Sequence, residues 1–369
     1  MKNKRIGKHF TVGAILIASI LIINFIYKFS TISPLNWKPQ LMPEMEGKLA
    51  ENNFLQSSKK IPLDGYFGPE DIAVNSKGEL YTGIRNKIDD FETGKIIKIS
   101  KNNEIKTIIE TDGWVAGIHF DKDENLIACH LNKGLVSINP SGKMDILAQK
   151  DDFGNSLSVP NDVDIASDGI IYFSNTTSRS NFTLDEALKI VLEQKPEGSL
   201  LKYDPTTKKV NTLISGLYFA NGVAVSKDDD FILVAETSRY RILKFWLKGN
   251  KKGQTEIFMD NLPGFPNGIS RRKDGTFWIG FSTCRNAEID KIQSDSFMKK
   301  ILWALPKLVR PKIKAYGLIM NVNDKGNVLK IYCDPSGKVV SEASSVEEYN
   351  GYVYLGGDVL KHINKFKLD

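Results

Sequence analysis

The amino-acid sequence predicts an all-β fold, a six-bladed β-propeller with helical inserts, preceded by a single N-terminal transmembrane helix. Three observations lead to this prediction: a sixfold repeat of short β-type runs, repeat spacings close to the length of a propeller blade, and one long uncharged apolar segment. The chain has 369 residues, of which 41% are hydrophobic and 25% charged, so it can bury a large core.

The uncharged segment covers residues 10–27, and as a helix it would span about 27 Å, close to the hydrocarbon thickness of a bilayer. A cleaved signal peptide is the alternative, but its apolar region is usually about 7–15 residues long and ends at a small-residue cleavage site. Four basic residues precede the segment and Lys28 follows it. This bias predicts a cytoplasmic tail at 1–9, an uncleaved signal-anchor at 10–27 and an extracytoplasmic (periplasmic, luminal or extracellular) remainder.

The formal net charge of +6 belongs mostly to this N-terminal region. Residues 1–30 carry five basic side chains and no acidic one, whereas residues 31–369 carry 45 basic and 44 acidic ones. A near-neutral remainder, in which no basic cluster interleaved with aromatic residues stands out, argues against a nucleic-acid partner. Residues 28–60 contain three prolines and no clear periodicity, so we expect a stalk or linker that leads into a propeller at 61–369.

One pattern recurs six times in the propeller region: a polar residue, an apolar residue two places later, a turn and a β-type run. The equivalent first positions are Glu70, Ala116, Asn161, Asn221, Asn267 and Ser344. Their separations are 46, 45, 60, 46 and 77 residues, and a propeller blade takes about 40–50. The two long intervals contain apolar residues at helical spacing within 182–192 and 289–311, which predicts helical inserts over one face of the disc. Two stacked β-sandwich domains are the rival architecture, but the pattern does not change character midway.

The innermost strand of each blade lines a central channel, so equivalent positions lie on a ring around the axis. Four ring positions, Glu70, Asn161, Asn221 and Asn267, offer a side-chain oxygen, and none is a His or Cys. Oxygen donors suit a hard cation such as Ca²⁺ better than zinc. The alternative is that these are ordinary turn residues that hydrogen-bond their own backbone. Their recurrence in register favours the metal site.

Several stretches of this sequence together resemble the strictosidine synthase-like family of six-bladed calcium propellers. The wider relatives of that family are the gluconolactonase/regucalcin group, the paraoxonases and diisopropylfluorophosphatase. The resemblance extends over roughly residues 60–360. The stretches that carry it are 159–162, 171–174, 219–223, 234–237, 263–267 and 278–280.

The resemblance implies a calcium ion in the central tunnel, held by Glu70, Asn161 and Asn221. The fourth ligand in the family is usually an aspartate, and Asn267 stands at the matching position. The formal ligand charge therefore falls to −1, and the affinity for calcium should fall with it. The catalytic glutamate of the plant synthase would match Ser344, which argues against its condensing chemistry.

The wider family implies a calcium-dependent hydrolase of small esters or lactones, in which the ion stabilises the developing oxyanion. No catalytic base is evident, because His119 is expected to face away from its ring position and His130 to reach at most a channel mouth. Glu236 and Arg241 match a family motif and are expected to form a structural ion pair or backbone hydrogen bonds. A non-catalytic propeller that binds a ligand or partner is the alternative, and a condensing synthase is a third reading.

Overall fold

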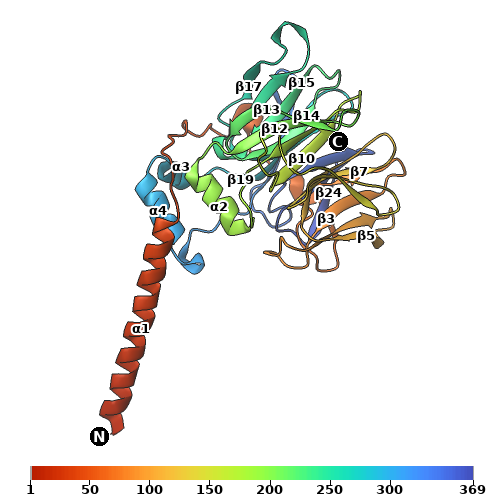
Figure 1. Cartoon of the computed structure of the whole chain (residues 1–369). Helices are drawn as coiled ribbons and strands as arrows, with labels where there is room; N and C mark the ends of the chain where they lie inside the picture. The colour runs from red at the N-terminus through yellow and green to blue at the C-terminus, as the bar shows by residue number, and fades with distance from the viewer. Residues whose placement is uncertain (1, 369) are drawn as a thin grey trace.

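Residues 2–368 are described by a computed structural model, with side chains described from Ile15 on, and within them 24 strands form six four-stranded antiparallel sheets. The sheets are arranged around a common axis as a six-bladed propeller (Figure 1). The predicted fold class is therefore confirmed for the propeller.

The first strand of each blade is innermost, and successive strands lie further from the axis. Blade 1 contains β2 (Ala73–Val74), β3 (Leu80–Ile84), β4 (Gly94–Ile99) and β5 (Ile105–Thr111). Blade 2 contains β6 (Val115–Phe120), β7 (Leu126–His130), β8 (Gly134–Ile138) and β9 (Met144–Ala148). Blade 3 contains β10 (Pro160–Ile165), β11 (Ile171–Asn175), β12 (Gly198–Asp204) and β13 (Lys209–Leu217).

The remaining blades follow the same order. Blade 4 contains β14 (Ala220–Val225), β15 (Phe231–Glu236), β16 (Arg241–Trp246) and β17 (Thr255–Met259). Blade 5 contains β18 (Gly264–Arg271), β19 (Phe277–Cys284), β20 (Gly317–Val322) and β21 (Val328–Asp334). Blade 6 contains β22 (Val346–Tyr349), β23 (Tyr352–Leu355), β24 (His362–Lys367) and β1 (Lys59–Pro62).

Blade 6 closes the ring, because its outermost strand comes from the N-terminal side of the chain. Strand β1 pairs with β24, and Ile61 lies opposite Ile363. The propeller therefore begins at residue 59 rather than at the expected residue 61. Six buried apolar clusters, one between each pair of neighbouring blades, form the core.

Both predicted helical inserts are present. Helix α2 (Leu184–Glu193) lies between β11 and β12, and α3 (Ala287–Gln293) and α4 (Ser296–Ala304) lie between β19 and β20. Each insert joins the second strand of a blade to the third, so both leave the disc on the same face. There Leu192 of α2 packs against Leu302 and Trp303 of α4. Short 3₁₀ helices complete the structure: η1 (Gly47–Leu49), η2 (Phe54–Ser57), η3 (Thr237–Arg239), η4 (Gly249–Lys251) and η5 (Lys307–Val309).

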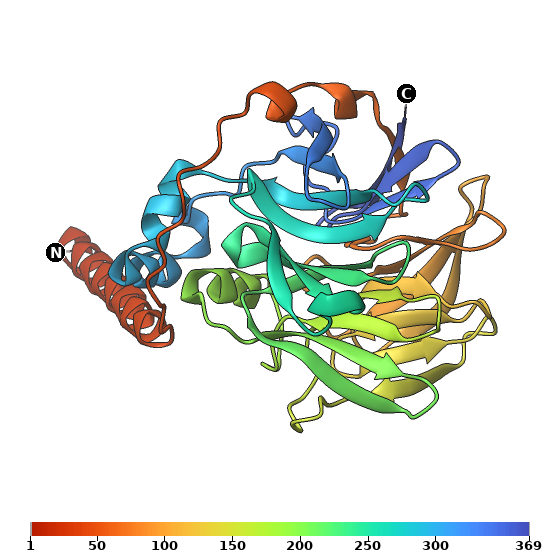
Figure 2. The ribbon, with the colours of Figure 1, turned by 90° about the horizontal axis from the view of Figure 1, so that it is seen from above.

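Helix α1 (Lys2–Ser30) projects from this helical face and contacts α4 near its own C-terminal end (Figures 1 and 2). Large apolar side chains between Ile15 and Tyr27 are exposed along it. Among the described residues, no helix combines the length and the apolar character needed to cross a membrane. The predicted span of 10–27 begins outside the residues whose side chains are described.

The segment that we expected to be a stalk lies against the propeller. The backbone N–H of Leu35 donates to Glu193 of α2, and that of Trp37 donates to Gln293 of α3. Ile32 is buried among the helices, and Leu55 is buried between blades 5 and 6. Isolated apolar residues among prolines therefore pack this segment against the propeller and its helices, although the segment has no periodic pattern.

Candidate functional site

The six ring positions lie beside one another at the helical face, where the innermost strands begin. The hydroxyl of Ser344 donates to the carbonyl of Glu70, 2.9 Å away, across the boundary between blades 6 and 1. A Cβ atom on Gly117, next to Ala116, would lie 2.5 Å from the carbonyl of Asn161. All six side chains are buried. The predicted register is therefore correct, while the role of these residues as metal ligands stays a prediction.

Two ring asparagines are oriented by hydroxyl groups of the neighbouring strands. The amide nitrogen of Asn161 donates to Oγ1 of Thr176 at 3.2 Å, and that of Asn267 donates to Oγ of Ser282 at 2.7 Å. Thr176 in turn donates to the carbonyl of Ala220 in the next blade, 2.7 Å away. Because the amide nitrogens are occupied in this way, the amide oxygens are the atoms left for a ligand.

Two further ring oxygens lack a partner among the described residues. Oε2 of Glu70 and Oδ1 of Asn221 are buried without a hydrogen bond. An unsatisfied buried acceptor costs about 1–3 kcal/mol, so a bound group is expected to complete the site. The residues present therefore fit a hard cation. Within the described part of the chain no group of three His, Cys, Asp or Glu side chains could hold a metal, so such a cation would depend on asparagine oxygens.

Three aspartates that we did not predict link the innermost strands of neighbouring blades. Oδ2 of Asp71 accepts from the N–H of Ile118 at 2.8 Å, and Oδ2 of Asp162 accepts from Val223 at 2.7 Å. The third is Asp164, which accepts from the N–H of Val225 at 2.7 Å.

The residue after the ring position is an aspartate in two blades and a glycine in three, for a physical reason. It holds Asp71 and Asp162 in blades 1 and 3, and Gly222 in blade 4. A Cβ atom on Gly222 would lie 2.1 Å from the carbonyl of Asn267, so the close approach of the next strand excludes a side chain. Aspartate at a position that is glycine in three other blades is the sequence signal that could have identified these residues.

The tunnel is strongly acidic. Burial raises the pKa of Glu70 well above its usual range. The carboxylates of Asp358, Asp71 and Asp162 raise this pKa further. Burial also raises the pKa of Asp71 to about 6 and that of Glu347 to about 8. A cation in the tunnel would lower these pKa values, because it favours the ionised carboxylates.

Arg85 is a buried cation next to this acidic centre. Its guanidinium lies between the rings of Phe91 and Trp114, 4.2 and 4.3 Å from their centroids. Nη2 donates to the carbonyl of Asp358 at 2.6 Å. Burial lowers the pKa of Arg85, whereas the carboxylates of Asp358 and Glu70 raise it. Arg85 therefore offsets part of the negative charge.

Neither candidate histidine is placed as a base. Nε2 of His119 lies 3.6 Å from Oδ1 of Asp164, on the innermost strand of the next blade, and its side chain is exposed. His130 is fully buried, with Nδ1 against the carbonyl of Leu131 and Nε2 3.5 Å from Asp112. Burial lowers the pKa of His130, so it is a neutral packing residue near neutral pH.

The motif pair Glu236 and Arg241 has the structural role that was expected. Nε of Arg241 is ion-paired with Oε2 of Glu236. Oε1 of Glu236 accepts from the N–H of Tyr218 at 2.9 Å. The carboxylate therefore fixes the loop that leads into β14 and Asn221.

Comparison with known proteins identifies the family. Models for strictosidine synthase and for the strictosidine synthase-like N-terminal region match residues 161–250 and 47–86. Adipocyte plasma membrane-associated protein of Rattus norvegicus is 32% identical over 350 residues, which cover 89% of this chain and 90% of the relative. Strictosidine synthase-like protein 13 of Arabidopsis thaliana is 30% identical over 305 residues, or 75% of each chain. The chain belongs to the strictosidine synthase-like family.

Solved structures with the same fold include hydrolase-type propellers. A gluconolactonase from Xanthomonas campestris aligns with a TM-score of 0.61 and 14% identity, over 91% of this chain and 97% of its own. A calcium-binding protein, regucalcin, from Agrobacterium tumefaciens aligns with a TM-score of 0.56 and 11% identity, over 85% and 94%. At this identity the likeness establishes the six-bladed fold alone.

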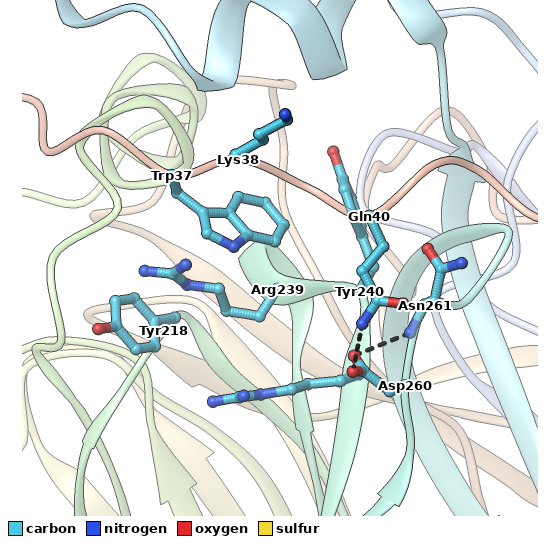
Figure 3. A pocket seen from close by; sticks show the side chains of 9 residues that line it. Trp37, Lys38, Gln40, Tyr218, Arg239, Tyr240, Asp260 and Asn261 are labelled. Carbon is cyan, nitrogen blue, oxygen red and sulfur yellow. Dashed lines mark hydrogen bonds between the residues drawn. The ribbon is translucent and has the colours of Figure 1, made fainter.

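This strictosidine synthase-like propeller also has a cavity of about 330 Å³ between the N-terminal segment and blade 4 (Figure 3). The guanidinium of Arg239 lies 4.6 Å from the Trp37 ring centroid and 3.7 Å from that of Tyr218. Trp37 also packs on Tyr240, at 5.4 Å between centroids. Nε2 of Gln40 donates to Asp260, as the dashed line in Figure 3 shows. These contacts hold the N-terminal segment on the helical face.

Proposed function

We propose that this strictosidine synthase-like protein is a membrane-anchored hydrolase of small esters or lactones that uses calcium in its central tunnel. The observation that carries the proposal is a pair of buried oxygens, on Glu70 and Asn221, that have no hydrogen-bond partner within the described part of the chain. Both residues are in register with Asn161 and Asn267. A fold shared with gluconolactonase supports the substrate class.

Glu70, Asn161, Asn221 and Asn267 would hold the ion. When bound, calcium supplies Lewis-acid polarisation of a substrate carbonyl. The chain itself fixes the amides of Asn161 and Asn267 through hydrogen bonds to the hydroxyl groups of Thr176 and Ser282. The inserts α2, α3 and α4 lie over this face, which favours a small substrate.

The test measures bound calcium and the hydrolysis of an aryl ester and a lactone by the purified chain, with and without a chelator. We expect chelation and Asn221→Ala to lower kcat/KM by at least about a hundredfold, because both remove the polarising ion. Asn102→Ala, at an exposed turn of blade 1, is the matched control and should leave the rate unchanged. Hydrolysis that persists in chelator and in Asn221→Ala would overturn the proposal.

A non-catalytic propeller is the second candidate function. It is favoured by the amide of Asn267 at the position of a family carboxylate and by the absence of a placed base among the described histidines. Calcium binding without hydrolysis of any ester or lactone would support this alternative.

We also propose that residues 10–27 anchor the protein in a membrane with its N-terminus cytoplasmic. Support comes from the uncharged run, its basic flanks and the exposed apolar side chains of α1. Homologues named plasma membrane-associated proteins agree with this location. We expect the chain to resist carbonate extraction from membranes, and release by carbonate would contradict the anchor.

A further inference from the structure

The insert of blade 5 exposes an unusual number of large apolar side chains. Over the part of the chain whose side chains are described, the densest group outside α1 lies in α4 and the segment after it. Leu308 is 96% exposed and Ile313 is 79% exposed. The other members of this group are Phe297, Met298 and Val309. Exposed apolar side chains gathered in this way mark a surface that contacts another phase or partner.

The same segment is strongly basic. Residues 296–316 contain no acidic residue and six basic ones, Lys299, Lys300, Lys307, Arg310, Lys312 and Lys314. Lys299 is buried and donates to the carbonyl of Leu35, while Lys307 and Arg310 pair with Asp185 of α2. A single carboxylate cannot neutralise two cations, and further lysines stand beside them, so the surface keeps a positive charge.

This surface is continuous with α1. The rings of Phe29 and Phe297 are 5.7 Å apart, and Nζ of Lys300 lies 5.4 Å from the Phe29 centroid. Nζ of Lys28 lies 5.5 Å from the ring of Trp303 in α4. In Figures 1 and 2, α4 stands against the C-terminal end of α1. The apolar group and the exposed apolar side chains of α1 therefore occupy the same side of the molecule.

We propose that α4 and residues 306–314 form a second membrane contact that rests on an anionic lipid surface. Leu308, Val309 and Ile313 enter the interfacial layer, while Lys312 and Lys314 lie at the level of the lipid phosphates. Anionic lipid attracts juxtamembrane lysines, and two copies of such a basic surface repel each other, so charge favours lipid over a second copy. The inference rests on the proposed membrane association, but it does not require α1 to cross the bilayer.

The experiment separates this contact from the N-terminal anchor by weakening α1. The full chain with Ile20→Lys and Ile23→Lys is mixed with vesicles of phosphatidylcholine alone or with about 30% phosphatidylserine, and bound protein is measured by flotation. We expect this variant to bind only the phosphatidylserine vesicles, and to lose binding at high salt. Adding Leu308→Asp and Ile313→Asp should weaken the binding at least about tenfold, because apolar insertion is lost.

The control adds Ile146→Asp and Ile257→Asp instead, two exposed isoleucines on the outer strands β9 and β17. These changes should leave vesicle binding unaltered, and thermal melts check that each variant folds. Equal losses in both variants, or no loss with the Leu308 and Ile313 changes, would overturn the second contact. So would a lipid-free dimer that those changes dissociate. Failure of the unmodified chain to float with neutral vesicles would instead contradict the anchor.

Discussion

At the residue scale, hydroxyl groups orient the side chains of the ring positions and connect neighbouring blades. Thr176 accepts from Asn161 and donates to Ala220, so one side chain orients a ring amide and joins two blades. Thr237 donates to the carbonyl of Pro266, directly before Asn267, in the next blade boundary. These threonines lie at the ends of the second strands, whereas the repeat pattern in the sequence is defined by residues of the first strands.

Thr176→Val should lower the free energy of unfolding by about 1–3 kcal/mol, because the carbonyl of Ala220 stays buried without its donor. The shape of the side chain is nearly kept, so packing changes little. Urea unfolding measures the loss. Thr206→Val, at an exposed turn of blade 3, is the matched control and should be within about 0.5 kcal/mol of the natural protein. A similar loss in both variants would contradict the assigned role of Thr176.

The tunnel carboxylates predict an unusual pH dependence for the calcium-free protein. The pKa values of Glu347 and Glu342 are raised to about 8 and that of Asp71 to about 6, so the folded state binds more protons than the unfolded state. Stability then falls as the pH rises from the unfolded pKa of about 4.5 toward 8. Urea unfolding at pH 5, 6.5 and 8 should show this decline. Glu347→Gln should flatten it, and an unchanged slope would refute the assignment.

At the element scale, the ring is closed by a strand from the opposite end of the chain. Strand β1 is only four residues long, yet Ile61 is buried in the cluster between blades 6 and 1. The sequence shows a short polar and apolar alternation there, but its partner β24 is about 300 residues away along the chain. The sequence pattern alone could not identify this pairing, because β1 and β24 become neighbours only when the six blades close into a ring.

Ile61→Ala should destabilise the propeller by about 2–4 kcal/mol, because it leaves a cavity at the closure. Lys60→Ala changes the neighbouring residue of the same strand, whose side chain is exposed, and serves as the control. Chemical unfolding of the two variants gives the comparison. A loss for Ile61→Ala no greater than that for Lys60→Ala would show that β1 does not hold the ring closed.

At the scale of the whole molecule, all six blades meet at the tunnel. Ser344 joins blade 6 to blade 1 beside Glu70, and Asp162 joins blade 3 to blade 4 near Asn221. A cation held there would contact residues of several blades, so its binding energy would add to the stability of the entire propeller. Five of the basic side chains behind the net charge of +6, in contrast, lie in residues 1–30, outside the disc.

Calcium at about 100 times its dissociation constant should raise the free energy of unfolding by about 2.7 kcal/mol, if only the folded chain binds it. Asn267→Asp adds a carboxylate at this ring position and should lower that dissociation constant about tenfold, since ligand charge tunes affinity. Thermal melts across a calcium titration measure both effects. Melting temperatures that do not change with calcium, in either the natural chain or the Asn267→Asp variant, would argue against the tunnel site.

Local sequence determined much of this protein. The repeat predicted six blades, and the helical spacing in 182–192 and 289–311 predicted the inserts. Both predictions were possible because the period of apolar residues along a segment indicates which of its faces is buried. The register of Glu70, Asn161, Asn221 and Asn267 was readable for the same reason. The net charge of residues 31–369, however, concealed the basic segment at 296–316, since distant acidic residues cancel it in the sum.

Only the tertiary structure determined which of these segments contact one another. The partners of Asp71, Asp162 and Arg85 could not be predicted from the sequence. The two aspartates accept hydrogen bonds from neighbouring blades. Arg85 packs between the rings of Phe91 and Trp114. It also could not show residues 31–58 lying against the disc, since the apolar residues that hold them follow no period. Periodicity is a property of one segment, whereas burial, charge coupling and surface continuity depend on which segments meet.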